Sequence, residues 1–135
     1  MPWPAYLPRD YVPGQKLRIE VYRRLARLRD QKKLDDFRAE LADRYGPPPD
    51  AAEWLLKATE IRILCVKWFI AAVHREHADL VFTYRNRKRA DELAKLSGGR
   101  LKVVDDKSLY LRLKPERDEE SLTGMYELLK RVLGV

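Results

Sequence analysis

Residues 45–68, YGPPPDAAEWLLKATEIRILCVKW, separate a helix-forming half of the chain from a strand-forming half. Gly46 predicts the left-handed end of a preceding helix. Because Pro47 has no N–H, a cap with a single hydrogen bond from Gly46 is favoured over the doubly bonded closure. Asp50 followed by Glu53 predicts a capping box at the start of a further helix. That helix is apolar on much of its circumference, so we expect it to be central and buried.

Two amphipathic helices are predicted before this stretch. The first covers residues 15–28, where arginines alternate with apolar residues at helical spacing: Leu17, Val21, Leu25 and Leu28. The second starts at about Gln31 with Asp30 as its N-cap, and one stripe carries Leu34, Phe37, Leu41 and Tyr45.

The amino-terminal residues 1–14 contain four prolines, which exclude a helix and predict an extended arm. The arm is too apolar for a free tail, because it carries Trp3, Tyr6, Tyr11 and Val12. We therefore expect it to lie across the body of the domain or against a neighbouring one.

After Trp68 the composition changes to that of strands. IAAVHRE (70–76) and ADLVFTY (78–84) predict a hairpin, and NRKRADELAKL (86–96) predicts a short helix that ends before Gly98. RLKVVD (100–105) and SLYLRLK (108–114) predict a second hairpin, with alternate leucines on one face: Leu109, Leu111 and Leu113.

A last helix is expected from about Glu119 to Leu133, with one apolar side formed by Leu122, Met125, Tyr126, Leu129 and Val132. The predicted fold is thus α+β: three N-terminal helices followed by a ββαββα unit, in which antiparallel hairpins carry helices on one face. We expect the arm (1–14) to be followed by one domain (15–135).

The composition limits the classes of function. The chain has 135 residues, 45% of them hydrophobic, and a formal net charge of +7, which favours acidic partners such as nucleic acid or an acidic protein face. No apolar stretch approaches the roughly 18 residues of a membrane span, so no membrane partner is expected. The single cysteine cannot form an internal disulfide. We expect a cytoplasmic protein.

No catalytic constellation is recognisable. The chain lacks a G-x-x-x-x-G-K-[ST] loop, a G-x-S-x-G elbow, an H-E-x-x-H motif and paired cysteines, so we predict neither an enzyme nor a cofactor. His74 and His77 fall on opposite faces of a predicted strand, which disfavours a metal site. Cys65 on the buried helix is expected to be a core residue and not a nucleophile.

Two basic clusters are candidate nucleic-acid contacts: Arg23, Arg24 and Arg27 on the first helix, and Arg87, Lys88 and Arg89 in the middle of the chain. They predict an alternative function, a small free-standing basic nucleic-acid-binding protein. However, acidic residues follow the first helix at once, and a solvated helix face is the commoner meaning of such a charge run.

A charged group at the end of the second helix predicts a different surface. The apolar stripe of that helix leaves Asp43 on the opposite side, with Glu40 and Arg44 at the flank. Asp43 occupies the last turn, where the helix dipole disfavours a negative charge by roughly 0.3–1 kcal/mol. Helix stability therefore does not account for it. An exposed Glu40–Arg44 pair at i, i+4 is the alternative, and spacing alone does not decide between the two interpretations.

The stretches PAYLPRDYVPGQKLRIEVYRRLA (4–26) and LDDFRAELADRYGPPPDAAEWLLKATEIRIL (34–64) resemble one family. It is the carboxy-terminal domain of the bacterial transcription-repair coupling factor, which links stalled RNA polymerase to nucleotide excision repair. The runs YRRLA and ELxDRYGPxP carry most of the likeness, since they combine unlike residue types. The chain departs from the family at Phe69, where a glycine is frequent.

The resemblance implies a non-catalytic regulatory domain. In that family the domain packs against an amino-terminal module similar to UvrB and covers the surface that recruits UvrA until RNA polymerase is engaged. Glu40, Asp43 and Arg44 match the acid, acid and arginine that the family places at this contact. The resemblance therefore predicts that these three residues bind another module.

Overall fold

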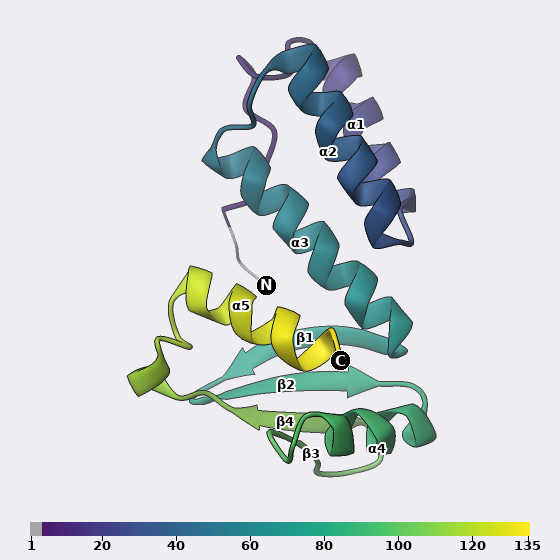
Figure 1. The fold of residues 1–135 in the computed structure, drawn as a ribbon, viewed down its shortest axis with the longest axis vertical. Coiled ribbons are helices and arrows are strands. Elements are labelled where there is room, and N and C mark those ends of the chain that lie inside the picture. Colours follow the sequence, from purple (N-terminus) through teal and green to yellow (C-terminus); the bar gives the residue numbers. More distant parts are fainter. Residues whose placement is uncertain (1–3) are drawn as a thin grey trace. The chain divides into compact units, whose positions relative to one another are not determined.

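The computed structural model describes residues 4–135, which divide into two compact units, one ending at Ile63 and one beginning at Leu64 (Figure 1). The boundary falls within one helix, and each unit is described by itself. Trp3 of the predicted arm lies outside the described residues. The division into an arm (1–14) and one domain (15–135) stays a prediction.

The N-terminal unit contains the three predicted helices: α1 (Gln15–Arg27), α2 (Gln31–Tyr45) and α3 (Asp50–Lys67). Asp30 is the N-cap of α2 as expected, because its Oδ1 accepts a hydrogen bond from the Lys33 N–H at 2.8 Å. At the other end, the Gly46 N–H donates to the Ala42 carbonyl at 2.9 Å, which confirms a cap with one hydrogen bond.

The prediction that Gly46 adopts the left-handed helical conformation is wrong, although the position still requires glycine. Its φ is 88° and its ψ is 179°. These angles lie outside the left-handed helical region, in a region that residues with a Cβ almost never occupy. The backbone leaves α2 in an extended direction, and three prolines then lead to α3.

The predicted capping box of α3 is wrong. The Glu53 N–H donates to the Pro49 carbonyl at 2.9 Å, so Asp50 is the first helical residue and not the N-cap. The Glu53 carboxylate instead accepts hydrogen bonds from Arg38 of α2 at 2.6 and 2.5 Å. A guanidinium is a stronger partner for a carboxylate than a backbone N–H, which explains the difference.

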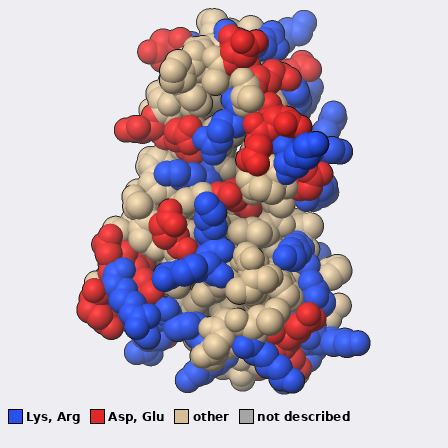
Figure 2. Space-filling view, viewed as in Figure 1, with Lys and Arg blue, Asp and Glu red and all other residues tan. Residues whose placement is uncertain are grey.

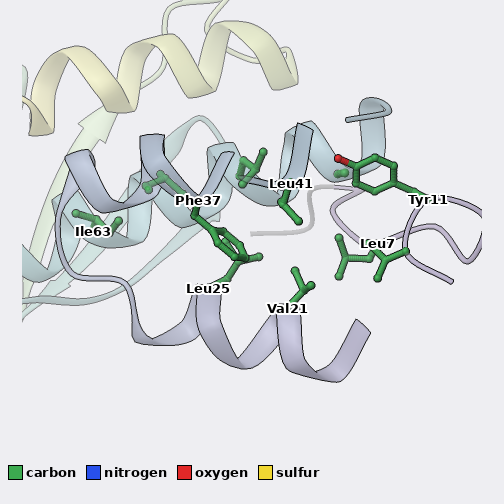
Figure 3. Close-up of a cluster of buried hydrophobic side chains, with 11 residues drawn as sticks. Leu7, Tyr11, Val21, Leu25, Phe37, Leu41 and Ile63 are labelled. Atoms are coloured by element: carbon green, nitrogen blue, oxygen red, sulfur yellow. The ribbon is translucent and has the colours of Figure 1, made fainter. Parts of the chain in front are cut away.

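One apolar core joins the arm to the three helices (Figure 3). It is formed by Leu7, Tyr11, Val12, Val21, Leu25, Leu34, Phe37, Leu41, Ala52, Leu56 and Ile63. The arm lies across the body of this unit, and it turns at Pro8, whose carbonyl accepts the N–H groups of Tyr11 and Val12. Leu17, expected in the stripe of α1, is 42% exposed. Each step of four residues rotates the stripe by about 40°, which places Leu17 at its edge.

The second unit is a four-stranded antiparallel sheet with two helices. Its strands are β1 (Ile70–Glu76), β2 (Asp79–Tyr84), β3 (Leu101–Val103) and β4 (Ser108–Arg112), in the order β1-β2-β4-β3. Helix α4 (Arg87–Leu96) lies between β2 and β3 in the chain, and α5 (Leu122–Leu133) follows the short helix η1 (Pro115–Arg117). This order confirms the predicted α+β fold.

Four apolar residues of the two central strands share one face of the sheet. Leu80 of β2 is opposite Leu111 of β4, and Phe82 is opposite Leu109. All four side chains are buried. The two helices supply further buried apolar residues: Ala90, Leu93, Met125, Tyr126, Leu128, Leu129, Val132 and Leu133.

The last helix begins later than predicted. α5 starts at Leu122 with Ser121 as its N-cap, and Leu122 is 39% exposed, so it does not join the buried side. Glu119, expected in the first turn, is 1% exposed. Its carboxylate accepts hydrogen bonds from Arg100 at 3.1 and 2.6 Å and from the Lys114 N–H at 2.8 Å. The segment before α5 is therefore held in place by the hydrogen bonds of the buried Glu119 carboxylate and is not α-helical.

Glu119 predicts an acid-sensitive stability. Burial raises its pKa, but the hydrogen bonds from Arg100 and Lys114 outweigh burial and leave the pKa below the usual 4.5. Its contribution is therefore complete above pH 4.5 and is lost as the pH falls through the lower pKa of the folded state. We expect Glu119→Ala to lower the free energy of unfolding by about 3 kcal/mol near pH 7, as measured by urea denaturation.

The matched control is Glu120→Gln, since Glu120 is adjacent but partly exposed in its pair with Arg75. This change should alter the unfolding free energy by less than about 1 kcal/mol. Equal losses for the two variants would contradict the role of the buried carboxylate.

Candidate interface at the end of helix α2

The three predicted interface residues lie on the last two turns of α2, and none is buried in the core. Asp43 and Arg44 are exposed, whereas Glu40 is partly covered. Within residues 4–135, the Asp43 carboxylate makes no hydrogen bond or ion pair. Asp43 is thus an uncompensated negative charge at the helix end that repels it.

Glu40 has a partner that the sequence did not indicate. Arg24 of α1 holds it with both terminal nitrogens of its guanidinium: Nη2 donates to Oε1 at 3.1 Å and Nη1 donates to Oε2. The hydrogen bond from Arg24 lowers the pKa of Glu40, and the nearby charge of Arg44 adds to this effect. The Arg24 guanidinium also lies 4.5 Å from the centre of the Phe37 ring.

This pairing joins residues that were predicted for two different surfaces. Glu40 was expected to bind another module and Arg24 to bind nucleic acid, but each neutralises the other. The sequence had also left open an i, i+4 pair between Glu40 and Arg44. In the structure Arg44 instead lies over the ring of Tyr45, at 5.5 Å from its centre.

The Arg44 side chain is supported by aromatic residues of the core edge. The Tyr45 ring meets the Tyr11 ring edge-on with 5.8 Å between their centres, and the Tyr11 hydroxyl donates to the Gly46 carbonyl at 2.9 Å. A cation stacked on a fixed ring is partly ordered before binding, which lowers the entropic cost of docking.

A shallow hollow between α1 and α2 adjoins this patch. It is lined by Arg24, Arg27, Leu28, Lys33, Asp36, Phe37 and Glu40. Lys33 and Asp36 were not predicted as site residues, although their helical spacing from Phe37 and Glu40 is visible in the sequence. In Figure 2, carboxylates and cations alternate over the face in view. The surface therefore suits a partner that also carries both signs of charge.

The two basic clusters are less available than their sequence suggests. On α1, Arg23 and Arg27 are exposed, but Arg24 is bound to Glu40. On α4, Arg87 pairs with Asp91 at 3.2 Å and Arg89 pairs with Glu92 at 3.0 Å. Lys88 is exposed.

The two histidines and the cysteine, which were considered as metal ligands or as a nucleophile, do not belong to the patch at the end of α2. His74 Nε2 is 3.3 Å from the Glu76 carboxylate on β1, and His77 forms the hairpin turn with a φ of 55°. Cys65 is buried, and desolvation raises the pKa of its thiol to about 11. Within the described chain, no group of three His, Cys, Asp or Glu side chains could hold a metal ion, and no helix could span a membrane.

Comparison with known proteins gives the family. The sequence model of the TRCF domain matches residues 1–94. The chain belongs to the TRCF domain family. A transcription-repair-coupling factor of Rickettsia typhi is 32% identical over 97% of this TRCF domain, and the factor of Rickettsia bellii is 30% identical over 83%. The factor of Haemophilus influenzae is 43% identical over 45% of the chain.

A solved structure shows the same fold over the whole chain. It is a crystal structure of the C-terminal domain of transcription-repair coupling factor, with a TM-score of 0.77 at 19% identity, and the match covers 99% of this chain and 86% of that one. The TRCF domain is short beside the full-length relatives: it spans 12% of the R. typhi factor and 5% of the H. influenzae factor.

The Arg24–Glu40 pair should contribute little to stability. The two side chains are 44% and 40% exposed, so solvent screens the attraction between them. In a double-mutant cycle of Arg24→Ala and Glu40→Ala, we expect a coupling energy below about 1 kcal/mol, measured by urea denaturation. The coupling should shrink further in about 1 M salt. A salt-independent coupling above about 2 kcal/mol would contradict this description.

Proposed function

We propose that this TRCF domain is a non-catalytic regulatory domain of a transcription-repair coupling factor. It docks on the UvrB-like amino-terminal module and masks the UvrA-binding surface until RNA polymerase is engaged. The exposed, unpaired carboxylate of Asp43 beside Arg44 is the observation that carries the proposal. The family membership and the crystal structure of a C-terminal domain with the same fold support it.

The position of Asp43 is costly without a partner. A carboxylate in the last turn of a helix is disfavoured by roughly 0.3–1 kcal/mol, and no cation within residues 4–135 pairs with it. A cation supplied by a docked module would make the free-energy contribution of this carboxylate favourable. Desolvated, hydrogen-bonded charge pairs at an interface contribute more than the same pairs on an exposed helix.

The neighbouring residues define what the partner must offer. Asp43 requires a cation, and Arg44, stacked on Tyr45, requires a planar acceptor such as a carboxylate. Glu40 is already neutralised by Arg24, so it presents little net charge to the partner. We therefore rank Asp43 and Arg44 above Glu40 in their contribution to docking.

Other features support a role without bond-making chemistry. The thiol has a pKa of about 11 and is buried, so little of it is nucleophilic thiolate at neutral pH. The two histidines lie on an exposed hairpin, and His74 Nε2 is 3.3 Å from the Glu76 carboxylate. These residues therefore support a regulatory role without catalysis.

Reversal of both charges tests the docking. Asp43→Lys together with Arg44→Glu should weaken binding of this chain to the isolated UvrB-like module by at least about tenfold, because each charge would face a like charge. Isothermal titration calorimetry measures this binding. In the intact factor, the same reversal should increase binding of UvrA.

The matched control is Asp106→Lys together with Lys107→Glu, since it reverses an adjacent acid and base in the same way at an exposed turn between β3 and β4. It should leave both measurements unchanged. Unchanged binding of the module and of UvrA after reversal of Asp43 and Arg44 would reject the proposed function.

A milder substitution separates docking from folding. Asp43→Asn removes the charge that the dipole of α2 disfavours, so the free energy of unfolding should stay constant or rise by about 0.3–1 kcal/mol. Docking should weaken at the same time. A loss of stability with Asp43→Asn would show that the carboxylate has a structural role within its own unit.

A further inference from the structure

Phe69 is an exposed aromatic ring in a backbone conformation that phenylalanine rarely adopts. Its side chain is 53% exposed and its φ is 57°. The residue is nevertheless well fixed: its N–H donates to the Val66 carbonyl at 3.1 Å, and its carbonyl accepts the Arg85 N–H at 3.0 Å. A bulky residue with a positive φ indicates strain, and such strain tends to occur at functional sites.

Basic residues of two segments lie next to the backbone of Phe69. Arg85 is joined to Phe69 by the backbone hydrogen bond, and Lys67 lies two residues before it. Arg89 Nη2 donates to the Lys67 carbonyl at 3.2 Å and its guanidinium lies 4.1 Å from the centre of the Trp68 ring, which ties the first turn of α4 to the end of α3.

The acids nearby do not neutralise this corner. Asp91 and Glu92 pair with Arg87 and Arg89, respectively. Arg85 and Lys88 are exposed, and their side chains make no hydrogen bond or ion pair with any residue of 4–135. Lys67 Nζ lies 3.4 Å from the Val135 carbonyl oxygen and 5.5 Å from the centre of the Trp68 ring. Three cations therefore have no side-chain carboxylate as partner within residues 4–135: Lys67, Arg85 and Lys88.

Lys88 also lies where its helix does not favour a cation. The first turn of α4 carries Arg87, Lys88 and Arg89 and no acidic residue. The positive end of a helix dipole repels cations in the first turn. As with Asp43 at the end of α2, the stability of α4 does not account for the charges, which suggests an anionic ligand.

We propose that this corner, formed by Lys67, Phe69, Arg85 and Lys88, binds single-stranded nucleic acid. Phe69 stacks on one unpaired base, and the three cations contact the phosphates on either side. One exposed ring among separated cations is the arrangement with which proteins bind single strands without sequence preference.

Two other anionic partners fit less well. Duplex DNA keeps its bases stacked on one another, so it offers no free base to the Phe69 ring. An acidic peptide offers carboxylates to the cations but no planar ring for stacking. The exposed ring of Phe69 therefore favours single-stranded nucleic acid as the ligand. The corner lies in the second unit, so it is distinct from the patch at Asp43 and does not depend on the proposed function.

Fluorescence anisotropy with a labelled oligothymidine of about 15 nucleotides tests the proposal on the full 135-residue chain. We expect Phe69→Leu to weaken binding by about tenfold, whereas Phe69→Tyr, which keeps the ring, should bind like the parent chain. Arg85→Ala and Lys88→Ala should each reduce the slope of log affinity against log salt by about 0.7.

His77→Ala is the matched control, because His77 is also exposed with a φ of 55° but lies at the other end of β1. It should not change the affinity for the single strand. A duplex of the same sequence length and a polyglutamate peptide serve as competitors, and both should compete more weakly than unlabelled oligothymidine.

Three results would overturn the proposal. The first is equal affinity of the Leu and Tyr variants at position 69, and the second is tighter binding to the duplex than to the single strand. The third is polyglutamate binding that exceeds the affinity for oligothymidine and depends on Phe69, which would assign the corner to an acidic protein segment. Circular dichroism of each variant checks that it is folded.

Discussion

The Gly46 N–H closes α2 on Ala42, while the Gly46 carbonyl accepts the hydroxyl of Tyr11 from the arm. One peptide position thus ends a helix, anchors the amino-terminal segment and directs the chain toward α3. Its φ of 88° and ψ of 179° allow only glycine in practice. Because the rings of Tyr11 and Tyr45 contact each other next to Gly46, the same residues fix the core and the charged end of α2.

These contacts around Gly46 explain how the exposed patch at the end of α2 can be well ordered. Arg44 rests on Tyr45, which in turn contacts Tyr11, whereas Glu40 is held by Arg24 from the neighbouring helix. Of Glu40, Asp43 and Arg44, only Asp43 has no partner within residues 4–135. The carboxylate of Asp43 therefore lies between two ordered side chains and requires a cation from its partner. Such a defined shape and charge requirement are typical of a specific interface and not of a general charged face.

Helical and strand periodicity was enough to predict the elements. The stripe of Leu34, Phe37 and Leu41 is buried as expected, and so are the alternating leucines of β4. These patterns are local, because each residue is related to a neighbour two to four positions away. The exposed side of α2 could be predicted for the same reason, and Asp43 lies on it.

The partners of charged side chains could not be predicted in this way. Arg24 and Glu40 are 16 residues apart, and Arg100 and Glu119 are 19 apart, so their encounters depend on how elements pack. The predictions from local sequence were wrong where a guanidinium distant in sequence was available. Glu53 binds Arg38 instead of forming a capping box, and Glu119 binds Arg100 instead of starting the last helix. Phe69 was visible in the sequence only as a departure from the family, and its positive φ appears only in the fold.

The buried sulfur of Cys65 has a practical consequence for experiments on this domain. With a pKa of about 11, only about one molecule in ten thousand carries the thiolate at pH 7, and the side chain is shielded from solvent. Maleimide dyes should therefore leave the native chain essentially unmodified. A second cysteine introduced at any exposed position would accept a fluorophore selectively, without removal of the natural one.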